Sequence, residues 1–467
     1  MTESPSLSPT SSPTKIFSPE PSEKPSFIPS IIPSGKPSSQ PSNKPSQQPS
    51  TIPSQHPTPT PSGEPSLEPT DKPSSFPTEE HSAIPSSSPS KSLQWDKLGS
   101  TIHGQDANLE LGKAVAISND GNTLAVSQHN EYSIDVYDNR EGVWVKRHTP
   151  VIGPKNSGFG SVISISKDGK IVAGGGYMWD NSRGLVQVWE WNGWFWVRLG
   201  STMLGSRQND HFGYSLALSN DGKNLIIGSR DHDSNESRGS IRVMQYDGEE
   251  WVQRGSRITG DYARDYFASR VDSVSITDDG NVIAAGAYGG NFVRAFKWDD
   301  TNWVQYGTDI HRSDTFYFGA AVELSSGMNG HLVLAIGSPR EKPGGIIHFY
   351  EWDDDNWSER PDSVSIESSI FIGYSMALSG DGNTVLCATD KAVFIFDWEN
   401  NNRWIQRGHT ILEVGGDPYG RISKTEILVD LSDDGNTVVV GLPQDDDGNL
   451  HGENKGQVQS FTWRRPE

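Results

Sequence analysis

The chain has 467 residues and a formal net charge of −21; 33% of its residues are hydrophobic and its mean hydropathy is −0.59. No stretch approaches the roughly 18 consecutive apolar residues of a membrane helix, so the composition excludes a membrane-spanning protein. The negative charge makes nucleic acid a poor partner, and the single cysteine, Cys387, excludes a disulfide framework.

Residues 1–92 hold 22 of the 30 prolines, most of them spaced four apart in a P-S-x-x repeat. Such a segment buries too little apolar surface to offset its ordering entropy, and proline favours extended backbone. We therefore predict a disordered Pro/Ser-rich stalk over residues 1–92. The start at Met1 lacks the basic and apolar regions of a secretory signal peptide, so we expect no such signal within this chain.

The rest of the sequence repeats about every 50 residues, and three markers share one frame. One marker is a tryptophan, found at Trp95, Trp144, Trp196, Trp251, Trp303, Trp357 and Trp404. Another is a bulky residue followed by a small one, such as Phe212-Gly213. The third is S/T-x-D-G, with Asp120, Asp168, Asp221, Asp279, Asp381 and Asp434; only the fifth unit breaks it, with Ser325-Ser326-Gly327. The markers predict seven repeats.

Each repeat is expected to contain four β-strands. In the third repeat they cover residues 212–219, 224–229, 240–246 and 251–257, with tight turns after the first and third strands. Seven such units predict an all-β fold in which residues 93–467 form a seven-bladed β-propeller. Trp95 lies in a fourth-strand pattern and Val458 in a third-strand pattern, so we expect the N-terminal strand to complete the last blade.

The segment from Trp196 to Gly228 resembles the FG-GAP repeats of integrin α-chain propellers and of many secreted microbial proteins. Its pattern is W-x-x-x-G-x-x-x-x-G-x-x-x-x-D-x-F-G-x-S-x-x-L-S-x-D-G-x-x-L-x-x-G. The stalk resembles that of diatom cell-surface proteins. Together these resemblances imply an extracellular, cell-surface or cell-wall propeller that recognises a ligand. Integrin-type repeats often carry a calcium loop, D-x-D/N-x-D-G-x-x-D, which is shortened here to S-x-D-G. A single carboxylate does not supply the six to eight oxygens that calcium takes, so we interpret these segments as turns.

The longer connections of a propeller with these turns lie on the opposite face, which is the default place to look for binding. Candidate ligand-binding aromatics on that face are Tyr177, Trp179, Tyr262, Tyr266, Phe316 and Tyr317, which suit either sugar stacking or packing over the channel mouth. Clustered oxygens at Asp231, Asp233, Asn235, Asp445 and Asp447 form either a calcium site or solvated acidic loops. No other cofactor is expected.

Two sequons predict N-glycosylation, at Asn235 in a long loop and at Asn356 beside the marker Trp357. No catalytic motif appears in a suitable context. We therefore expect a non-enzymatic recognition or structural module that binds glycan or protein through the long-loop face. The alternatives are a propeller glycoside hydrolase acting on extracellular polysaccharide, whose paired acids cannot be located by spacing, and an intracellular WD-like scaffold.

Overall fold

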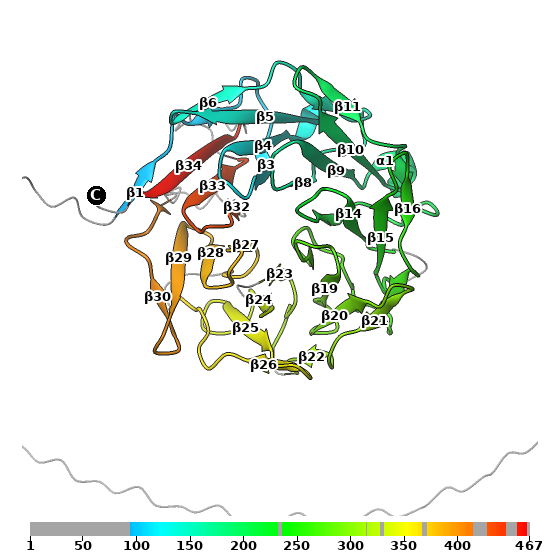
Figure 1. Cartoon of the computed structure of the whole chain (residues 1–467), viewed down its shortest axis with the longest axis vertical. Helices are drawn as coiled ribbons and strands as arrows, with labels where there is room; N and C mark the ends of the chain where they lie inside the picture. The colour runs from blue at the N-terminus through cyan, green and yellow to red at the C-terminus, as the bar shows by residue number, and fades with distance from the viewer. Residues whose placement is uncertain are drawn as a thin grey trace, which may run out of the picture. The chain divides into compact units, whose positions relative to one another are not determined.

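Seven innermost strands surround a central axis in this computed structural model, which describes residues 94–231, 236–313, 315–326, 331–366, 371–413, 427–444 and 455–464 (Figure 1). The predicted stalk lies outside these residues. The innermost strands are β3 (Leu111–Ile117), β8 (Val162–Ile165), β13 (Ser215–Leu218), β18 (Val274–Ile276), β23 (Ala321–Ser325), β27 (Met376–Leu378) and β32 (Leu428–Leu431). Each pairs antiparallel with a second strand: β4 (Thr123–Gln128), β9 (Ile171–Gly176), β14 (Asn224–Ser229), β19 (Val282–Ala287), β24 (Val333–Ser338), β28 (Thr384–Ala388) or β33 (Thr437–Leu442).

Two further layers complete each blade. The third strands are β5 (Ser133–Arg140), β10 (Leu185–Trp191), β15 (Ser240–Tyr246), β20 (Phe292–Trp298), β25 (Ile346–Trp352), β29 (Ala392–Glu399) and β34 (Gln457–Arg464). The outer strands are β6 (Val143–Lys146), β11 (Trp196–Arg198), β16 (Trp251–Gln253), β21 (Trp303–Gln305), β26 (Trp357–Glu359), β30 (Arg403–Gln406) and β1 (Gln94–Lys97). In the described part of the chain these strands form seven sheets, so the predicted seven-bladed, nearly all-β propeller is confirmed.

Short segments extend most blades. The two-residue strands β2 (Ile102–His103), β7 (Val151–Ile152), β12 (Met203–Leu204), β17 (Ile258–Thr259), β22 (Ile310–His311) and β31 (Leu412–Glu413) each pair with the third strand of their sheet. Helical turns occur at η1 (His129–Glu131) and α1 (Trp179–Ser182).

The first and fourth strands of the third blade are shorter than expected, and the first also ends one residue earlier, at Leu218. The first strand begins at Ser215 instead of residue 212, because Gly213 adopts a left-handed φ of 82° that turns the chain into the blade. The fourth ends at Gln253, and Gly255, with a φ of 76°, interrupts pairing until β17. Only glycine adopts this conformation without strain, so the same residues that mark the repeat also end the strands.

The hydrophobic core lies between neighbouring blades. One cluster, for example, packs Ile226 and Val243 of the third blade against Phe267, Val274 and Ile283 of the fourth. The second strands are covered on both faces, and all six residues of β14 are buried. Each blade therefore needs its neighbours to bury its apolar surface, which makes the ring cooperative.

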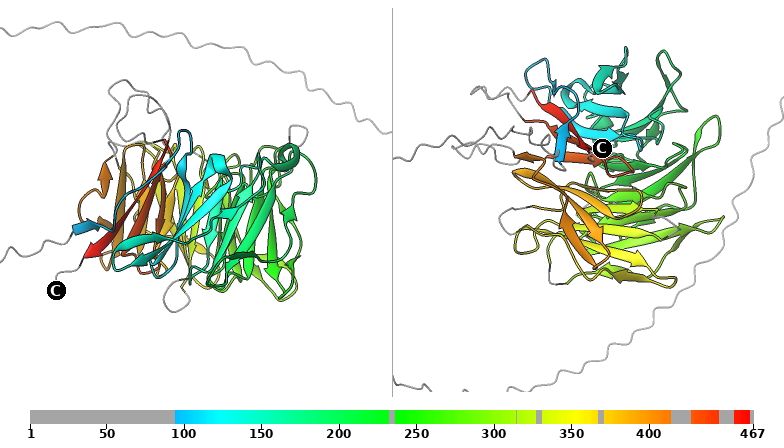
Figure 2. Two further views of the ribbon diagram at one scale, coloured as in Figure 1. Left: turned by 90° about the horizontal axis from the view of Figure 1, so that it is seen from above. Right: turned by 60° about the vertical axis from the view of Figure 1, so that its left-hand side comes forward.

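The N-terminal and C-terminal strands of the propeller belong to one sheet. β1 pairs antiparallel with β34, with Trp95 opposite Trp463 and their rings 5.1 Å apart, and Figure 2 shows the two strands side by side. The Trp95 indole also donates to the Arg407 carbonyl of the preceding blade at 3.1 Å. This pairing covers two edges that would otherwise be open.

Arginines join the outer edge of one blade to the next. Four of them donate from Nη1 to a glycine carbonyl in the following S-x-D-G turn: Arg147 to Gly169, Arg254 to Gly280, Arg360 to Gly382 and Arg407 to Gly435. Each also lies within 6 Å of a tryptophan ring of the next blade. We call these four residues the interblade arginines.

Candidate functional site

The S-x-D-G segments form the turns between first and second strands. In the first blade the Ser118 hydroxyl donates to Oδ1 of Asp120 at 2.6 Å, and the same oxygen accepts the Asn122 amide at 3.0 Å. Burial favours a higher pKa for Asp120, but these hydrogen bonds outweigh it and the pKa is lowered. The carboxylate oxygen is therefore engaged by its own turn, as the turn interpretation expects.

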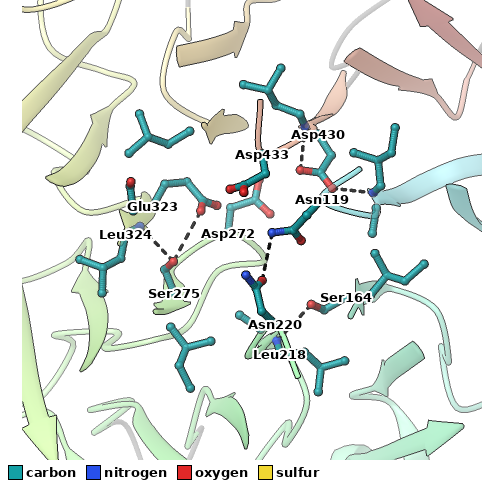
Figure 3. Close-up of a pocket in the computed structure, with 18 of the residues that line it drawn as sticks. Asn119, Ser164, Leu218, Asn220, Asp272, Ser275, Glu323, Leu324, Asp430 and Asp433 are labelled. Atoms are coloured by element: carbon teal, nitrogen blue, oxygen red, sulfur yellow. Dashed lines mark hydrogen bonds between the residues drawn. The ribbon is translucent and has the colours of Figure 1, made fainter. Parts of the chain in front are cut away.

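The central channel contains a cavity of about 230 Å³ at the end where these turns gather. Figure 3 shows its polar lining, to which the innermost strands and the turns both contribute. The labelled acids and amides are Asn119, Asn220, Asp272, Glu323, Asp430 and Asp433. The cavity is thus acidic and lies at the face opposite the long loops.

Several of the channel side chains connect neighbouring blades. The Ser164 hydroxyl accepts the Leu218 amide of the next blade at 3.1 Å, and Oδ2 of Asp430 accepts the Ile117 amide across the ring closure at 2.7 Å. An innermost strand leaves amides unpaired on its channel side, and these side chains satisfy them. The interactions explain why serine and aspartate occupy channel positions.

Two channel carboxyls have strongly perturbed acidity. Burial, together with the charges of Asp272 and Asp430, raises the pKa of Glu323 well above its usual value. Burial also raises the pKa of Asp430 to about 7, although two backbone amides donate to it. Both side chains keep partial contact with solvent through the channel. Among the described residues, no group of three or more His, Cys, Asp or Glu side chains is arranged to hold a metal ion.

The opposite mouth of the channel carries a continuous cluster of tyrosines and arginines. We call it the tyrosine–arginine rim and define it as Tyr214, Arg230, Tyr266, Arg270, Tyr288, Tyr317, Arg340 and Tyr374. These residues come from the third to the sixth blades, at the start of first strands, after second strands and in the connections between them. The rim is therefore assembled from positions scattered over about 160 residues of sequence.

Ring stacking forms the middle of the rim. The Tyr288 ring lies between Tyr266, at 5.1 Å and 13°, and Tyr317, at 5.2 Å and 25°. Such offset pairs stabilise each other by about 0.5–1.5 kcal/mol beyond their buried area. Burial raises the pKa of Tyr288, although Arg230 and Arg270 oppose this effect, so the Tyr288 hydroxyl remains neutral at physiological pH.

The arginines lie over the tyrosine faces. Arg230 lies 5.6 Å from the centroid of Tyr266, Arg270 lies 4.5 Å from that of Tyr374, and Arg340 lies 4.2 Å from that of Tyr317. A hydrogen bond with Tyr374 raises the pKa of Arg340 against a small opposing effect of burial. Cation–π contacts of this kind restrict where each guanidinium lies over its tyrosine.

These three guanidinium groups differ from the ion-paired arginines of the propeller. Arg147, Arg294 and Arg407 each bind a carboxylate, whereas within the described ranges no carboxylate lies at ion-pair distance from Arg230, Arg270 or Arg340. The buried Nε of Arg230 also has no hydrogen-bond partner among those residues. The rim is thus a positive patch on a negatively charged protein.

The backbone beneath the rim is strained. The residue before each bulky–small pair has a positive φ in six blades, at Glu110, Gly158, His211, Tyr266, Tyr317 and Phe371. Glycine, present in the second blade, would relieve a cost of about 1 kcal/mol or more at each position. The aromatic residues at three of these positions therefore point to a role other than folding.

The structure brings together part of the predicted aromatic set. Tyr266 and Tyr317 belong to the rim, and Tyr177 extends it, with its ring 4.8 Å from Tyr214. Tyr262 and Phe316 flank the rim with 74% and 72% of their surface exposed. Trp179 instead packs partly buried against the core between the first and second blades.

The predicted acidic cluster is only partly visible. Asp231 is buried and forms an ion pair with Arg257, so a guanidinium already neutralises this carboxylate. Asp233, Asn235, Asp445 and Asp447 lie outside the described residues. The other predicted glycosylation site, Asn356, accepts the Thr308 amide at 2.9 Å and donates to its hydroxyl at 3.1 Å.

Tyr214, Tyr288, Tyr374 and the three rim arginines were not among the sequence candidates. Two of them carry a signal, because Tyr214 and Tyr374 each follow the bulky–small pair directly. The arginines have no such common position, and only the fold brings them together. None of the described helices is long and apolar enough to cross a membrane.

No protein-family model matches this sequence, and no curated protein sequence matches it either. The chain is similar in structure to the β-propeller domain of Myceliophteria thermophila Cps50 (Swd1), with 12% identity, a TM-score of 0.51, and coverage of 79% of this chain and 99% of that one. U3-55K is similar over 78% of this chain and 98% of its own, with 15% identity and a TM-score of 0.48. Hydrazine synthase from Kuenenia stuttgartiensis is similar over 76% of this chain and 95% of its own, with 14% identity and a TM-score of 0.49. At such identities the likeness shows the fold alone.

Proposed function

We propose that this chain is a non-enzymatic recognition module of the cell surface, which binds glycan or protein through the tyrosine–arginine rim and the long loops around it. The observation that carries the proposal is the rim itself, where arginines with no carboxylate partner among the described residues lie over stacked tyrosines at one mouth of the ring. Tyrosine and arginine are the residue types that most often dominate binding energy at interfaces.

The extracellular part of this proposal rests on sequence. The resemblance of the repeats to FG-GAP propellers and of the P-S-x-x stalk to cell-surface proteins supports it, because a stalk would hold the propeller away from a wall or membrane. A propeller is also a common binding or scaffold module, which fits a function without catalysis.

Binding to a glycan array and to cell-wall material tests the proposal with the full chain. The double variant Tyr266→Ala/Tyr317→Ala removes two rim rings and should lower binding at least tenfold while the fold is kept. Trp194→Ala is the matched control, because this ring is 82% exposed in the hairpin between β10 and β11, at the turn face. Loss of binding in the control but not in the rim variant would show that the wrong face was chosen.

A hydrolase is the second candidate, and the perturbed carboxyls of the channel favour it. Glu323, whose pKa is raised by burial and by the Asp272 charge, belongs to the kind of carboxyl pair that general acid–base catalysis uses. Glu323→Gln should abolish any release of reducing sugar from polysaccharide if this candidate is correct. Equal release by both proteins would mean that Glu323 is not the catalytic acid, whereas no release by either would leave recognition as the function.

A further inference from the structure

The charge of the rim is opposite to that of the protein. The chain carries a net charge of −21, yet the rim holds three arginines without a carboxylate at ion-pair distance in the described residues. Arg294, by contrast, pairs with Asp261 and Asp309. Arg230 and Arg270 are partly buried, and a partly buried cation is unfavourable for folding unless an anion, such as one on a ligand, neutralises it.

The geometry of the arginines suits oxyanions. Each guanidinium lies over a tyrosine ring, which restricts its rotamers before binding, so less side-chain entropy is lost when a ligand arrives. The N–H edge of a stacked guanidinium matches the two oxygens of a carboxylate or sulfate group.

Exposed aromatic residues lie close in sequence to the rim tyrosines. Tyr262 and Phe316 are 74% and 72% exposed beside Tyr266 and Tyr317, and Phe371, whose ring lies 5.4 Å from Tyr374, is 39% exposed. Flat apolar rings of this kind stack on the apolar faces of sugar rings. A ligand in which sugar rings bear acidic groups would use both features, whereas an acidic peptide offers the charges without regular stacking faces.

We infer that the rim binds an anionic polysaccharide, one whose sugar rings carry carboxylate or sulfate groups. This inference rests on the proposed function and specifies its ligand class. The protein's overall negative charge does not prevent such binding at physiological salt, because the Debye length is then about 8 Å and the nearest cations dominate. The contact is charge-assisted, so affinity falls as salt is raised.

Four polymers test the inference with the full chain in affinity electrophoresis and calorimetry: polygalacturonate, dextran sulfate, neutral dextran and polyglutamate. Polygalacturonate or dextran sulfate should bind at least tenfold more tightly than neutral dextran, and the stronger of the two identifies the acidic group. Arg270→Gln/Arg340→Gln should weaken that binding at least tenfold. Arg403→Gln is the control, since Arg403 is an exposed arginine at the outer edge of the sixth blade, and should change binding less than twofold.

Four outcomes overturn the inference: no binding of any polymer, equal binding of neutral dextran, equal binding of polyglutamate, or unchanged polyanion binding by the arginine double variant. The proposed function is tested separately. If Tyr266→Ala/Tyr317→Ala abolishes binding of a neutral glycan or a protein while the arginine variant does not, recognition at the rim stands and only the anionic ligand is wrong. If neither variant affects any binding, both are wrong.

Discussion

Replacing one interblade arginine tests how the ring is held together. Arg360 is 3% exposed, donates to the Gly382 carbonyl at 3.0 Å and lies 4.6 Å from the Trp398 ring centroid. In Arg360→Leu the lost charged hydrogen bond costs about 1.5–3 kcal/mol, and the lost cation–π contact costs up to about 2 kcal/mol. The ion pair with Glu351 adds less than about 1 kcal/mol because that carboxylate is 48% exposed.

Leucine itself should fit, because Leu199 occupies the aligned position in the second blade and packs against its neighbour's core. Burial of the leucine side chain offsets part of the lost stability, so we expect the free energy of unfolding to fall by about 2–4 kcal/mol. In a propeller of this size, that corresponds to a fall in melting temperature of about 3–5 °C by calorimetry. Arg403→Leu, at an exposed position, should change it by less than about 1 °C. If the two variants have the same melting temperature, the arginines do not couple the blades.

Three other perturbations have defined outcomes. Deleting residues 1–92 should leave the melting temperature unchanged, whereas deleting residues 1–104 removes both N-terminal strands from β34 and should lower it by many degrees; equal effects would contradict the closure. Because burial raises the pKa of Asp430 from 3.8 to about 7, its contribution to stability is fully present below pH 4 and lost as pH rises through 7. Asp430→Asn should therefore gain about 2 kcal/mol relative to wild type between pH 4 and 8, a discounted value because water reaches the channel, and a constant difference across that range would refute it. In a secretory host, peptide mapping should find little glycan at Asn356, whose amide is bound to Thr308; full occupancy would mean that this contact opens readily.

The sequence determined the blades because their defining interactions are local. The serine and aspartate of S-x-D-G accept hydrogen bonds from amides within five residues, as Ser118 and Asp120 do. Each turn is therefore specified by the residues of its own motif. Tryptophan spacing and buried second strands such as β14 then give the number and order of strands. The same logic placed Tyr266 and Tyr317 on the long-loop face, because their loops follow directly from the strand count.

Only the tertiary structure decided how those positions combine. Arg270 contacts Tyr288 and Tyr374, which are 86 residues apart, because the ring brings the fourth and sixth blades to one mouth. Glu323 and Asp430 become acidic neighbours in the channel for the same reason, and Trp179 turns into the core instead of towards the rim. Local hydrogen bonds and periodic burial can be predicted from residues close together in the sequence. Contacts between blades depend instead on the closure of the ring and on which side chains then share a face.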